Sequence, residues 1–264
     1  MMLAIDTSTN YASLALTDGA TLLAELNWRV GQRHGSETLE RAQWLLREAN
    51  VDLSTVDGVA VATGPGSFNG LRVALATAKS LAFALDAPLY GIPTLDVIAW
   101  GVRQSTYPIW ALIDAGRGEL YAACYAGGAA NEQWAPVTQS INGQPDPYII
   151  TTPAELAAHT SGPLVALGEW RETMQVALQD ALGQRACFVS PLEVRRGAAL
   201  ATLAGMRATH NRVDDPQTLE PLYMRRPHIT KSARKLTPAT TDQSDEPDDT
   251  QESTRGGEGA AHAV

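Results

Sequence analysis

Two alternating apolar runs joined by a glycine-containing turn constrain the fold of this chain more than any other feature. Residues 11–17 and 20–27 each place apolar side chains at every second position. A period of two is typical of β-strands, and the intervening Asp18-Gly19 favours a tight turn with positive φ at both central residues. The sequence therefore predicts a β-hairpin, preceded by a short apolar strand over residues 3–5.

Helical and strand-like spacing then alternate along the chain. Residues 36–50 carry apolar side chains on one helical stripe. Further elements are expected as strands at 58–62 and 89–92 and as helices at 70–85 and 94–104, the last of them capped by Thr94. A hairpin followed by strand–helix alternation predicts an α/β fold, with a mixed sheet covered by helices. Ribonuclease-H-like domains and the actin, hexokinase and Hsp70 ATPase superfamily share this unit, which is an analogy of fold only.

A second cycle begins near Tyr107. Its first expected strand ends in Ile113-Asp114, as the first strand of the chain ends in Ile5-Asp6. The remaining elements are expected as strands at 109–113, 119–125, 148–150 and 164–167 and helices at 153–159, 171–182 and 198–210. We therefore expect a duplicated plan, with one ribonuclease-H-like domain over 1–107, a second over 108–225, and a tail over 226–264.

Composition excludes several classes of protein. The 264 residues are 44% apolar with a net charge of -9, which argues against disorder throughout and against a globally basic nucleic-acid binder. Cys124 and Cys187 are expected to be reduced, because two cysteines make no disulfide framework. No stretch reaches the roughly 20 apolar residues of a membrane span, and no export signal opens the chain, so we expect a cytoplasmic protein without a membrane partner.

The tail differs from the rest of the chain. Residues 225–236 carry five positive charges and no negative ones, and from Thr237 onward there is no Leu, Ile, Met or aromatic residue. Such a composition predicts a basic strip followed by a disordered acidic segment.

The stretch from Gly64 to Arg72 lies between an expected strand and an expected helix, where backbone N–H groups commonly bind phosphate. Its spacing fails the known templates. A P-loop needs four residues between its glycines, but only three separate Gly66 from Gly70. Asn69 stands where a dinucleotide fingerprint or a nucleophile elbow needs glycine. We interpret the glycines as a rigid turn that permits close backbone approach.

Asp6, Thr7 and Ser8 follow the first strand, and Asp114 ends the corresponding strand of the second half. A carboxylate and hydroxyls at a strand end suit a nucleotide, although Ser and Thr there also satisfy local backbone groups. These four residues are candidates for a vestigial nucleotide site, with no cofactor required and weak nucleotide binding left open. No histidine pair has metal-ligand spacing, so neither a metal site nor a catalytic set is predicted.

The expected helix over 70–85 has apolar or small residues on two opposite faces, so it must be covered on both. One face suits the sheet. The other contains Val73, Ala76, Thr77, Ser80 and Ala84, and Trp44 lies off the apolar stripe of the preceding helix. Cover from within the chain and cover by another protein chain both remain open, and these six residues are the candidate partner interface.

Four stretches of the sequence resemble one family when taken together. They are Leu3–Ser8, Gly64–Arg72, Ile113–Tyr121 and Glu220–Arg225, in that order. The family is the bacterial TsaB (YeaZ) family, the dimerization subunit of the complex that synthesises tRNA threonylcarbamoyladenosine. Two departures are Asn69, where the family usually has threonine, and Gly116-Arg117, where arginine usually follows the alanine directly.

The resemblance implies a two-lobed fold of the actin and Hsp70 ATPase superfamily. It implies a non-catalytic scaffold that pairs with the catalytic paralogue TsaD and works with the ATPase TsaE on tRNA. That complex transfers a threonylcarbamoyl group to the adenosine beside the anticodon of tRNAs reading ANN codons. A homodimer is expected where the partner is absent. The alternative is a nucleotide-binding phosphotransferase of the same superfamily.

Overall fold

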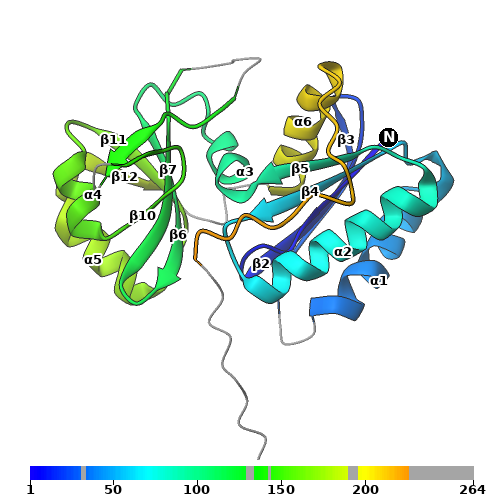
Figure 1. Cartoon of the computed structure of the whole chain (residues 1–264), viewed down its shortest axis with the longest axis horizontal. Coiled ribbons are helices and arrows are strands. Elements are labelled where there is room, and N and C mark those ends of the chain that lie inside the picture. Colours follow the sequence, from blue (N-terminus) through cyan, green and yellow to red (C-terminus); the bar gives the residue numbers. More distant parts are fainter. Residues whose placement is uncertain (31–33, 129–133, 142–143, 190–195, 226–264) are drawn as a thin grey trace, which may run out of the picture. The chain divides into compact units, whose positions relative to one another are not determined.

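The computed structural model describes residues 1–30, 34–128, 134–141, 144–189 and 196–225, and the basic strip beyond Arg225 and the acidic tail lie outside this part. Two five-stranded mixed sheets form the framework (Figure 1). The first has the order β3-β2-β1-β4-β5, and the second has the order β10-β7-β6-β11-β12. This is the α/β architecture with two mixed sheets that the sequence predicts.

The first sheet begins with a three-stranded antiparallel meander. Its strands are β1 (Met2–Asp6), β2 (Tyr11–Asp18) and β3 (Thr21–Arg29). The hairpin prediction is confirmed, but Asp18 pairs with Thr21, so the turn is centred on Gly19 and Ala20 rather than on Asp18-Gly19. Gly19 takes the positive φ, at +54°. The register of this pair also shifts between Leu16 and Thr17, as at a β-bulge.

Two parallel strands complete this sheet, β4 (Gly58–Gly64) beside β1 and β5 (Leu89–Pro93) beside β4. The helices that connect them are α1 (His34–Glu48), a short 3-10 turn (Leu53–Thr55) and α2 (Phe68–Leu85). Alternation along the buried strands separates two kinds of side chain. Leu3 and Ile5 face α1 and α2 in one core, whereas Ala4 faces the opposite side.

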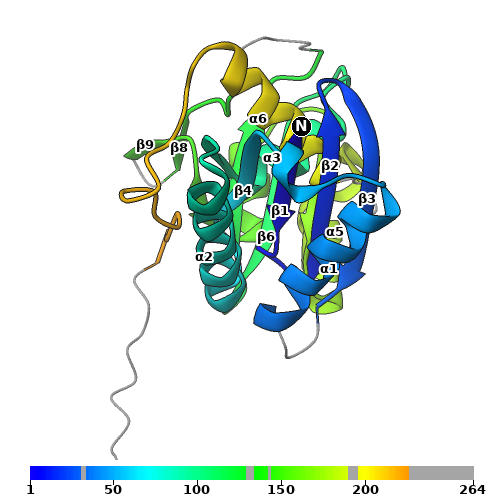
Figure 2. The same ribbon diagram turned by 90° about the vertical axis from the view of Figure 1, so that its right-hand side faces the viewer.

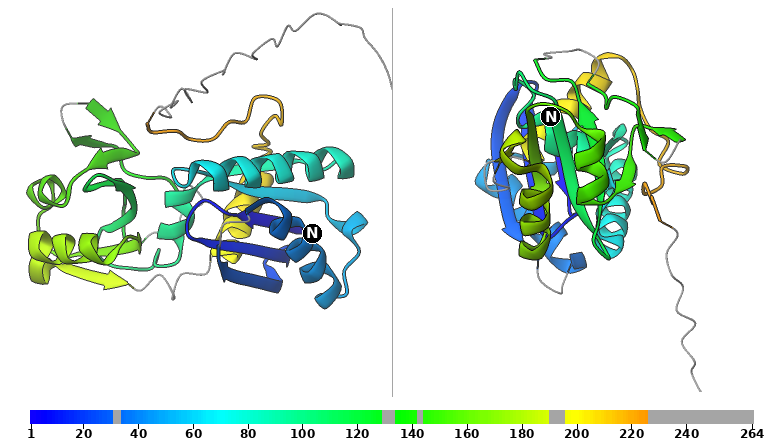
Figure 3. Two further views of the ribbon diagram at one scale, coloured as in Figure 1. Left: turned by 90° about the horizontal axis from the view of Figure 1, so that it is seen from below. Right: turned by 90° about the vertical axis from the view of Figure 1, so that its left-hand side faces the viewer.

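The second sheet repeats this pattern of pairing. β6 (Ile109–Gly116), β7 (Glu119–Tyr125) and β10 (Ile149–Thr151) are antiparallel, and β11 (Leu164–Glu169) and β12 (Ala186–Val189) continue in parallel from β6. Helices α4 (Pro153–His159) and α5 (Glu172–Leu182) pack on one face, and both views in Figure 3 show them there. A small separate ribbon pairs β8 (Gln139–Ile141) with β9 (Gln144–Asp146), and a 3-10 turn (Gly183–Arg185) follows α5.

Two helices contact each other and connect the sheets. α3 (Thr94–Trp100) packs against β6 of the second sheet, and α6 (Arg196–Thr209) packs against β1 and β2 of the first. The alanine-lined face of the first sheet lets α6 approach closely. The chain therefore returns to its first sheet after building its second. A division at residue 107 stays a prediction, and α6 contacts elements on the other side of it.

The structure corrects the expected helix over 94–104. α3 ends at Trp100 and continues as turns, and Thr94 is its first residue rather than its cap. The Thr94 hydroxyl instead accepts a hydrogen bond from the Gly64 N–H, at 3.1 Å. Within the described residues, no helix is both long and apolar enough to cross a membrane.

Candidate functional site

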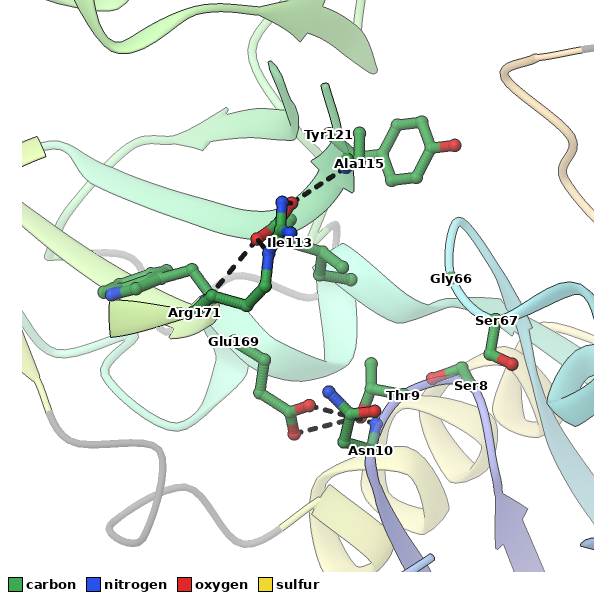
Figure 4. Close-up of a pocket in the computed structure, with 13 residues that line it drawn as sticks. Ser8, Thr9, Asn10, Gly66, Ser67, Ile113, Ala115, Tyr121, Glu169 and Arg171 are labelled. Atoms are coloured by element: carbon green, nitrogen blue, oxygen red, sulfur yellow. Dashed lines mark hydrogen bonds and ion pairs between the residues drawn. The ribbon is translucent and has the colours of Figure 1, made fainter. Parts of the chain in front are cut away.

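A cavity of about 380 Å³ lies where strands of both sheets end (Figure 4). The carboxyl ends of β6 and β11 contribute to it from the second sheet, and the turn after β1 and the loop after β4 contribute from the first. Strand ends of this kind are where ligands bind in many α/β proteins. The lining residues are Ser8, Thr9, Asn10, Gly66, Ser67, Ile113, Asp114, Ala115, Gly116, Tyr121, Glu169, Trp170 and Arg171.

The turn after β1 brings only part of the predicted nucleotide site to this cavity. Ser8 lines it, but its N–H and its hydroxyl both donate to Oδ1 of Asp6, at 2.8 and 2.5 Å. Thr7 is buried and donates to the Gly70 carbonyl at 2.7 Å. Asp6 is fully buried, and its Oδ2 has no hydrogen-bond partner in the part of the chain that the structure describes. Asp6 and Thr7 therefore do not line the cavity, whereas Ser8 and Asp114 do.

The glycine-rich loop packs directly against this turn, and its glycines permit the close backbone approach that the sequence predicts. A Cβ atom on Gly66 would lie 2.0 Å from the Ser8 carbonyl oxygen, and one on Gly70 would lie 2.0 Å from that of Thr7. The Ser67 N–H donates to the Ser8 carbonyl at 2.7 Å. The Ser67 hydroxyl caps α2 by accepting from the Gly70 N–H. Two glycines thus let one backbone lie directly on another.

Asp114 forms an ion pair on the opposite wall of the cavity. Its carboxylate accepts from Nε of Arg171 at 2.7 Å, from NH2 of Arg171 at 3.2 Å and from the Gly116 N–H at 2.8 Å. Burial acts to raise the pKa of Asp114, but these hydrogen bonds outweigh it and hold the pKa below its ordinary value. The nearby Arg117 is exposed in the β6–β7 turn and does not line the cavity.

A second ion pair is buried at the floor of the site and was missed by sequence reasoning. Oε1 of Glu169 lies 2.6 Å from NH2 of Arg196, and the two side chains are 7% and 4% exposed. Burial raises the pKa of Glu169 above its ordinary value, against the opposing effect of Arg196. The available signal was a lone charge ending an apolar strand, the same signal that marked Asp6 and Asp114. Nothing in the sequence pattern indicated that Arg196 would form an ion pair with Glu169.

The phosphotransferase alternative and the vestigial nucleotide site both call for a nucleotide here, and the residues of the cavity do not fit one. Both carboxylates on its wall, Asp114 and Glu169, would repel phosphate, and Asp6 is buried beneath. Arg171, the cation in the lining, is already paired with Asp114, and Arg196 is paired with Glu169. The described residues also contain no group of three or more His, Cys, Asp or Glu side chains able to hold a metal ion.

The candidate interface forms a separate surface on the outer side of the first sheet. α1 and α2 contact each other there (Figure 2), and their inner residues, including Ala42 and Leu75, belong to the core. The six predicted interface residues are all at least partly exposed: Trp44, Val73, Ala76, Thr77, Ser80 and Ala84. Phe83, on the same helix, is 88% exposed. The two-faced helix therefore buries only one of its faces within the described chain.

Comparisons with known proteins relate the chain to a family. A sequence model of the tRNA N6-adenosine threonylcarbamoyltransferase family, TsaD, matches residues 29–146. An uncharacterized protein of Mycobacterium tuberculosis (strain ATCC 25618 / H37Rv) is 30% identical over 230 residues, which cover 86% of this chain and 92% of that protein. The tRNA threonylcarbamoyladenosine biosynthesis protein TsaB of Bacillus subtilis (strain 168) is 32% identical over 124 residues, which cover 47% of this chain and 54% of that protein. The chain belongs to the TsaB (YeaZ) family.

A further relative and a solved structure are also similar to this chain. TsaB of Escherichia coli (strain K12) is 33% identical over 126 residues, covering 47% of this chain and 54% of that protein, so the chain spans about half the length of these two curated relatives. The structure of YeaZ from Pseudomonas aeruginosa has a TM-score of 0.69 at 24% identity, covering 84% of this chain and 99% of that one. The chain therefore shares the fold of YeaZ, and the α/β architecture with two mixed sheets that the sequence predicted is confirmed.

The four stretches that resemble the TsaB family surround one region of the molecule. The stretch containing Leu222 crosses the end of β4, just before the glycine-rich loop, because the Leu222 N–H donates to the Thr63 carbonyl at 2.7 Å. Tyr223 contacts Phe68 with ring centroids 5.4 Å apart. Arg225 then pairs with Glu119 and donates to the Ala115 carbonyl. Family motifs distant in sequence are therefore joined by direct contacts beside the cavity.

Proposed function

We propose that this chain is a non-catalytic dimerization subunit of the complex that transfers a threonylcarbamoyl group to the adenosine beside the anticodon of tRNAs reading ANN codons. In this proposal the chain pairs with the catalytic paralogue TsaD in the cytoplasm, and TsaE and tRNA join the same complex. The observation that carries it is the exposed outer face of α1 and α2 in a member of the TsaB family. The two ribonuclease-H-like lobes, divided near residue 107, would provide the scaffold.

The chemistry of the outer face supports helix-on-helix pairing. Small side chains at Ala76, Ser80 and Ala84 are exposed along α2, which allows another helix to approach closely. Large side chains flank them, with Phe83 88% exposed and Trp44 44% exposed. Aromatic anchors beside a close-packing stripe are typical of the centre of a protein–protein interface.

The extent of the TsaD family match supports a paralogue as the partner. Residues 29–146 match that family, and this range contains both α1 and α2. A paralogue can therefore present an equivalent helix pair to this one. The same reasoning favours self-association when the paralogue is absent, because each copy presents the same surface.

The test is a binding titration between the purified chain and TsaD from the same source. Ala76→Glu places a carboxylate at the centre of the proposed interface. When TsaD binds, this carboxylate would be buried without an opposite charge to pair with it. We expect the affinity to fall at least about a hundredfold, or roughly 3 kcal/mol. Trp44→Ala should weaken binding in the same direction by removing an anchor. The matched control is Val176→Glu, which makes a similar change at a half-exposed position on α5.

Circular dichroism and thermal melting of each variant establish that it is folded. Normal binding by folded Ala76→Glu and Trp44→Ala variants would place the interface elsewhere.

The chain alone should neither hydrolyse ATP nor modify tRNA above background. The phosphotransferase alternative is less favoured, because two carboxylates face the cavity and its arginine is paired. Robust turnover by the isolated chain, lost in Asp6→Ala, would reverse that preference.

A further inference from the structure

The carboxylate of Glu169 is held by the kinds of donor that proteins use for phosphate. The Thr9 hydroxyl donates to Oε1 at 2.9 Å, and the Asn10 backbone N–H donates to Oε2 at 3.2 Å (Figure 4). The Arg196 guanidinium lies 2.6 Å from Oε1. A hydroxyl, a backbone N–H and a guanidinium converging on two oxygens form a typical oxyanion site.

These donors are fixed in place by the rest of the fold. NH1 of Arg196 also contacts the Thr9 hydroxyl and the Tyr11 carbonyl, so the guanidinium is oriented independently of Glu169. The Gly197 N–H donates to Ser13 Oγ at 2.9 Å, which anchors the start of α6 on β2. Thr9 and Arg196 are only 6% and 4% exposed. Removal of the Glu169 carboxylate would therefore leave a formed group of donors and a buried, unpaired positive charge.

We propose that Thr9, the Asn10 N–H and Arg196 form a phosphate-class oxyanion site that Glu169 of the same chain occupies. Glu169 lines the cavity described above, so an anion that enters the cavity reaches the position of its carboxylate. In the native chain Glu169 fills this position and repels a second anion. The cavity therefore fits a nucleotide poorly because the Glu169 carboxylate takes the place of a phosphate, and not because the phosphate donors are missing.

The experiment measures thermal stability while phosphate is titrated against chloride at matched ionic strength, near neutral pH. Glu169→Ala removes the carboxylate and should be stabilised progressively by phosphate, since a ligand that binds only the folded state raises its melting temperature. We expect its affinity for phosphate to exceed that of the native chain by at least about tenfold. The double variant Glu169→Ala with Arg196→Met removes the cation as well, and should lose the response.

A second variant covers the case in which Glu169→Ala does not fold in buffer. Glu169→Ser also vacates the position of the carboxylate while leaving a short polar side chain, and it should gain the same phosphate response. Parallel titrations with ADP distinguish a nucleotide phosphate from inorganic phosphate as the source of the anion. A response to either ligand that depends on Arg196 supports the proposal.

Folded Glu169→Ala or Glu169→Ser that responds to neither ligand would overturn the proposal, as would equally strong phosphate binding by the native chain. An equal response in the double variant would also overturn it, because the anion would then bind without Arg196. None of these readouts involves TsaD, so they are independent of the proposed pairing through α1 and α2.

Discussion

Gly66 and Gly70 hold the cavity turn in place because they lack side chains. In each case the nearest obstacle to a Cβ atom is a backbone carbonyl oxygen 2.0 Å away, which no rotamer change can move. Gly66→Ala and Gly70→Ala should therefore each lower the free energy of unfolding by about 2–4 kcal/mol, in the range of overpacked or strained sites. Urea denaturation near neutral pH measures this change.

The matched control is Gly205→Ala, in the middle of α6. A Cβ atom there has no heavy atom within 4 Å beyond its own helix, so this substitution should be neutral or should stabilise by up to about 1 kcal/mol. If the two loop variants were as stable as this control, the close backbone contact would not constrain the fold.

Asp96 gives the molecule a pH dependence away from the cavity. Oδ1 of Asp96 accepts hydrogen bonds from the hydroxyls of Tyr125 and Tyr148, at 2.6 and 2.8 Å. Burial raises its pKa to about 6, although both tyrosines and Arg207 oppose the rise. In the unfolded chain the pKa returns to near 4, so the folded state binds more protons between these values. Stability contributed by protonated Asp96 is therefore lost as pH rises through about 6.

Asp96→Asn tests this prediction, because an amide oxygen still accepts from the tyrosines but does not titrate. The free energy of unfolding of the native chain, relative to that of the variant, should fall by about 3 kcal/mol from pH 4 to pH 7. Urea denaturation at several pH values measures the difference. The matched control is Asp180→Asn, which makes the same chemical change at an exposed position on α5. A difference that is constant with pH would contradict the raised pKa of Asp96.

At the scale of whole elements, periodicity predicted the long helices and central strands well. α2 was expected at 70–85 and runs from Phe68 to Leu85, because its inner apolar stripe is a local signal. The three-residue strands β8 and β9 were not predicted, since so few residues carry no measurable period. β12, at the edge of the second sheet, was missed for a similar reason. The turn after β2 lies one residue later than predicted, because its position depends on the register of strand pairing, which the local pattern does not specify.

Tertiary placement marks the limit of the sequence argument. The pattern of α6 predicts a helix but does not say which sheet it covers, and its contacts are with β1 and β2. The Glu169–Arg196 pair depends on this placement, because its two members come from β11 and from the start of α6. For the same reason the sequence identified Ser8 and Asp114 at the cavity but included Asp6 and Thr7, which do not line it.

At the scale of the whole molecule, the segment over residues 214–225 links the two sheets. Its first contact is on the first sheet, where Asp214 accepts from the Gly91 N–H at 2.7 Å and from Arg207 at 3.0 Å. It then crosses β4 at Leu222, and Figure 1 shows this segment in orange between α6 and the second sheet. Its last described contact joins Arg225 to the β6–β7 turn. The segment thus contacts both sheets that form the walls of the cavity.

Arg225→Ala should remove the contact between this segment and the second sheet without unfolding either sheet. The ion pair with Glu119 is about one-third exposed, so its loss should cost only about 1 kcal/mol in global stability. Local opening should rise more clearly, because the β6–β7 turn and residues 220–224 lose a shared contact. Hydrogen exchange measured by mass spectrometry should therefore increase in those two regions while α2 remains protected. Arg212→Ala, an exposed change before the segment, is the control. Unchanged exchange in both regions, or a uniform increase that includes α2, would show that Arg225 does not couple this segment to the second sheet.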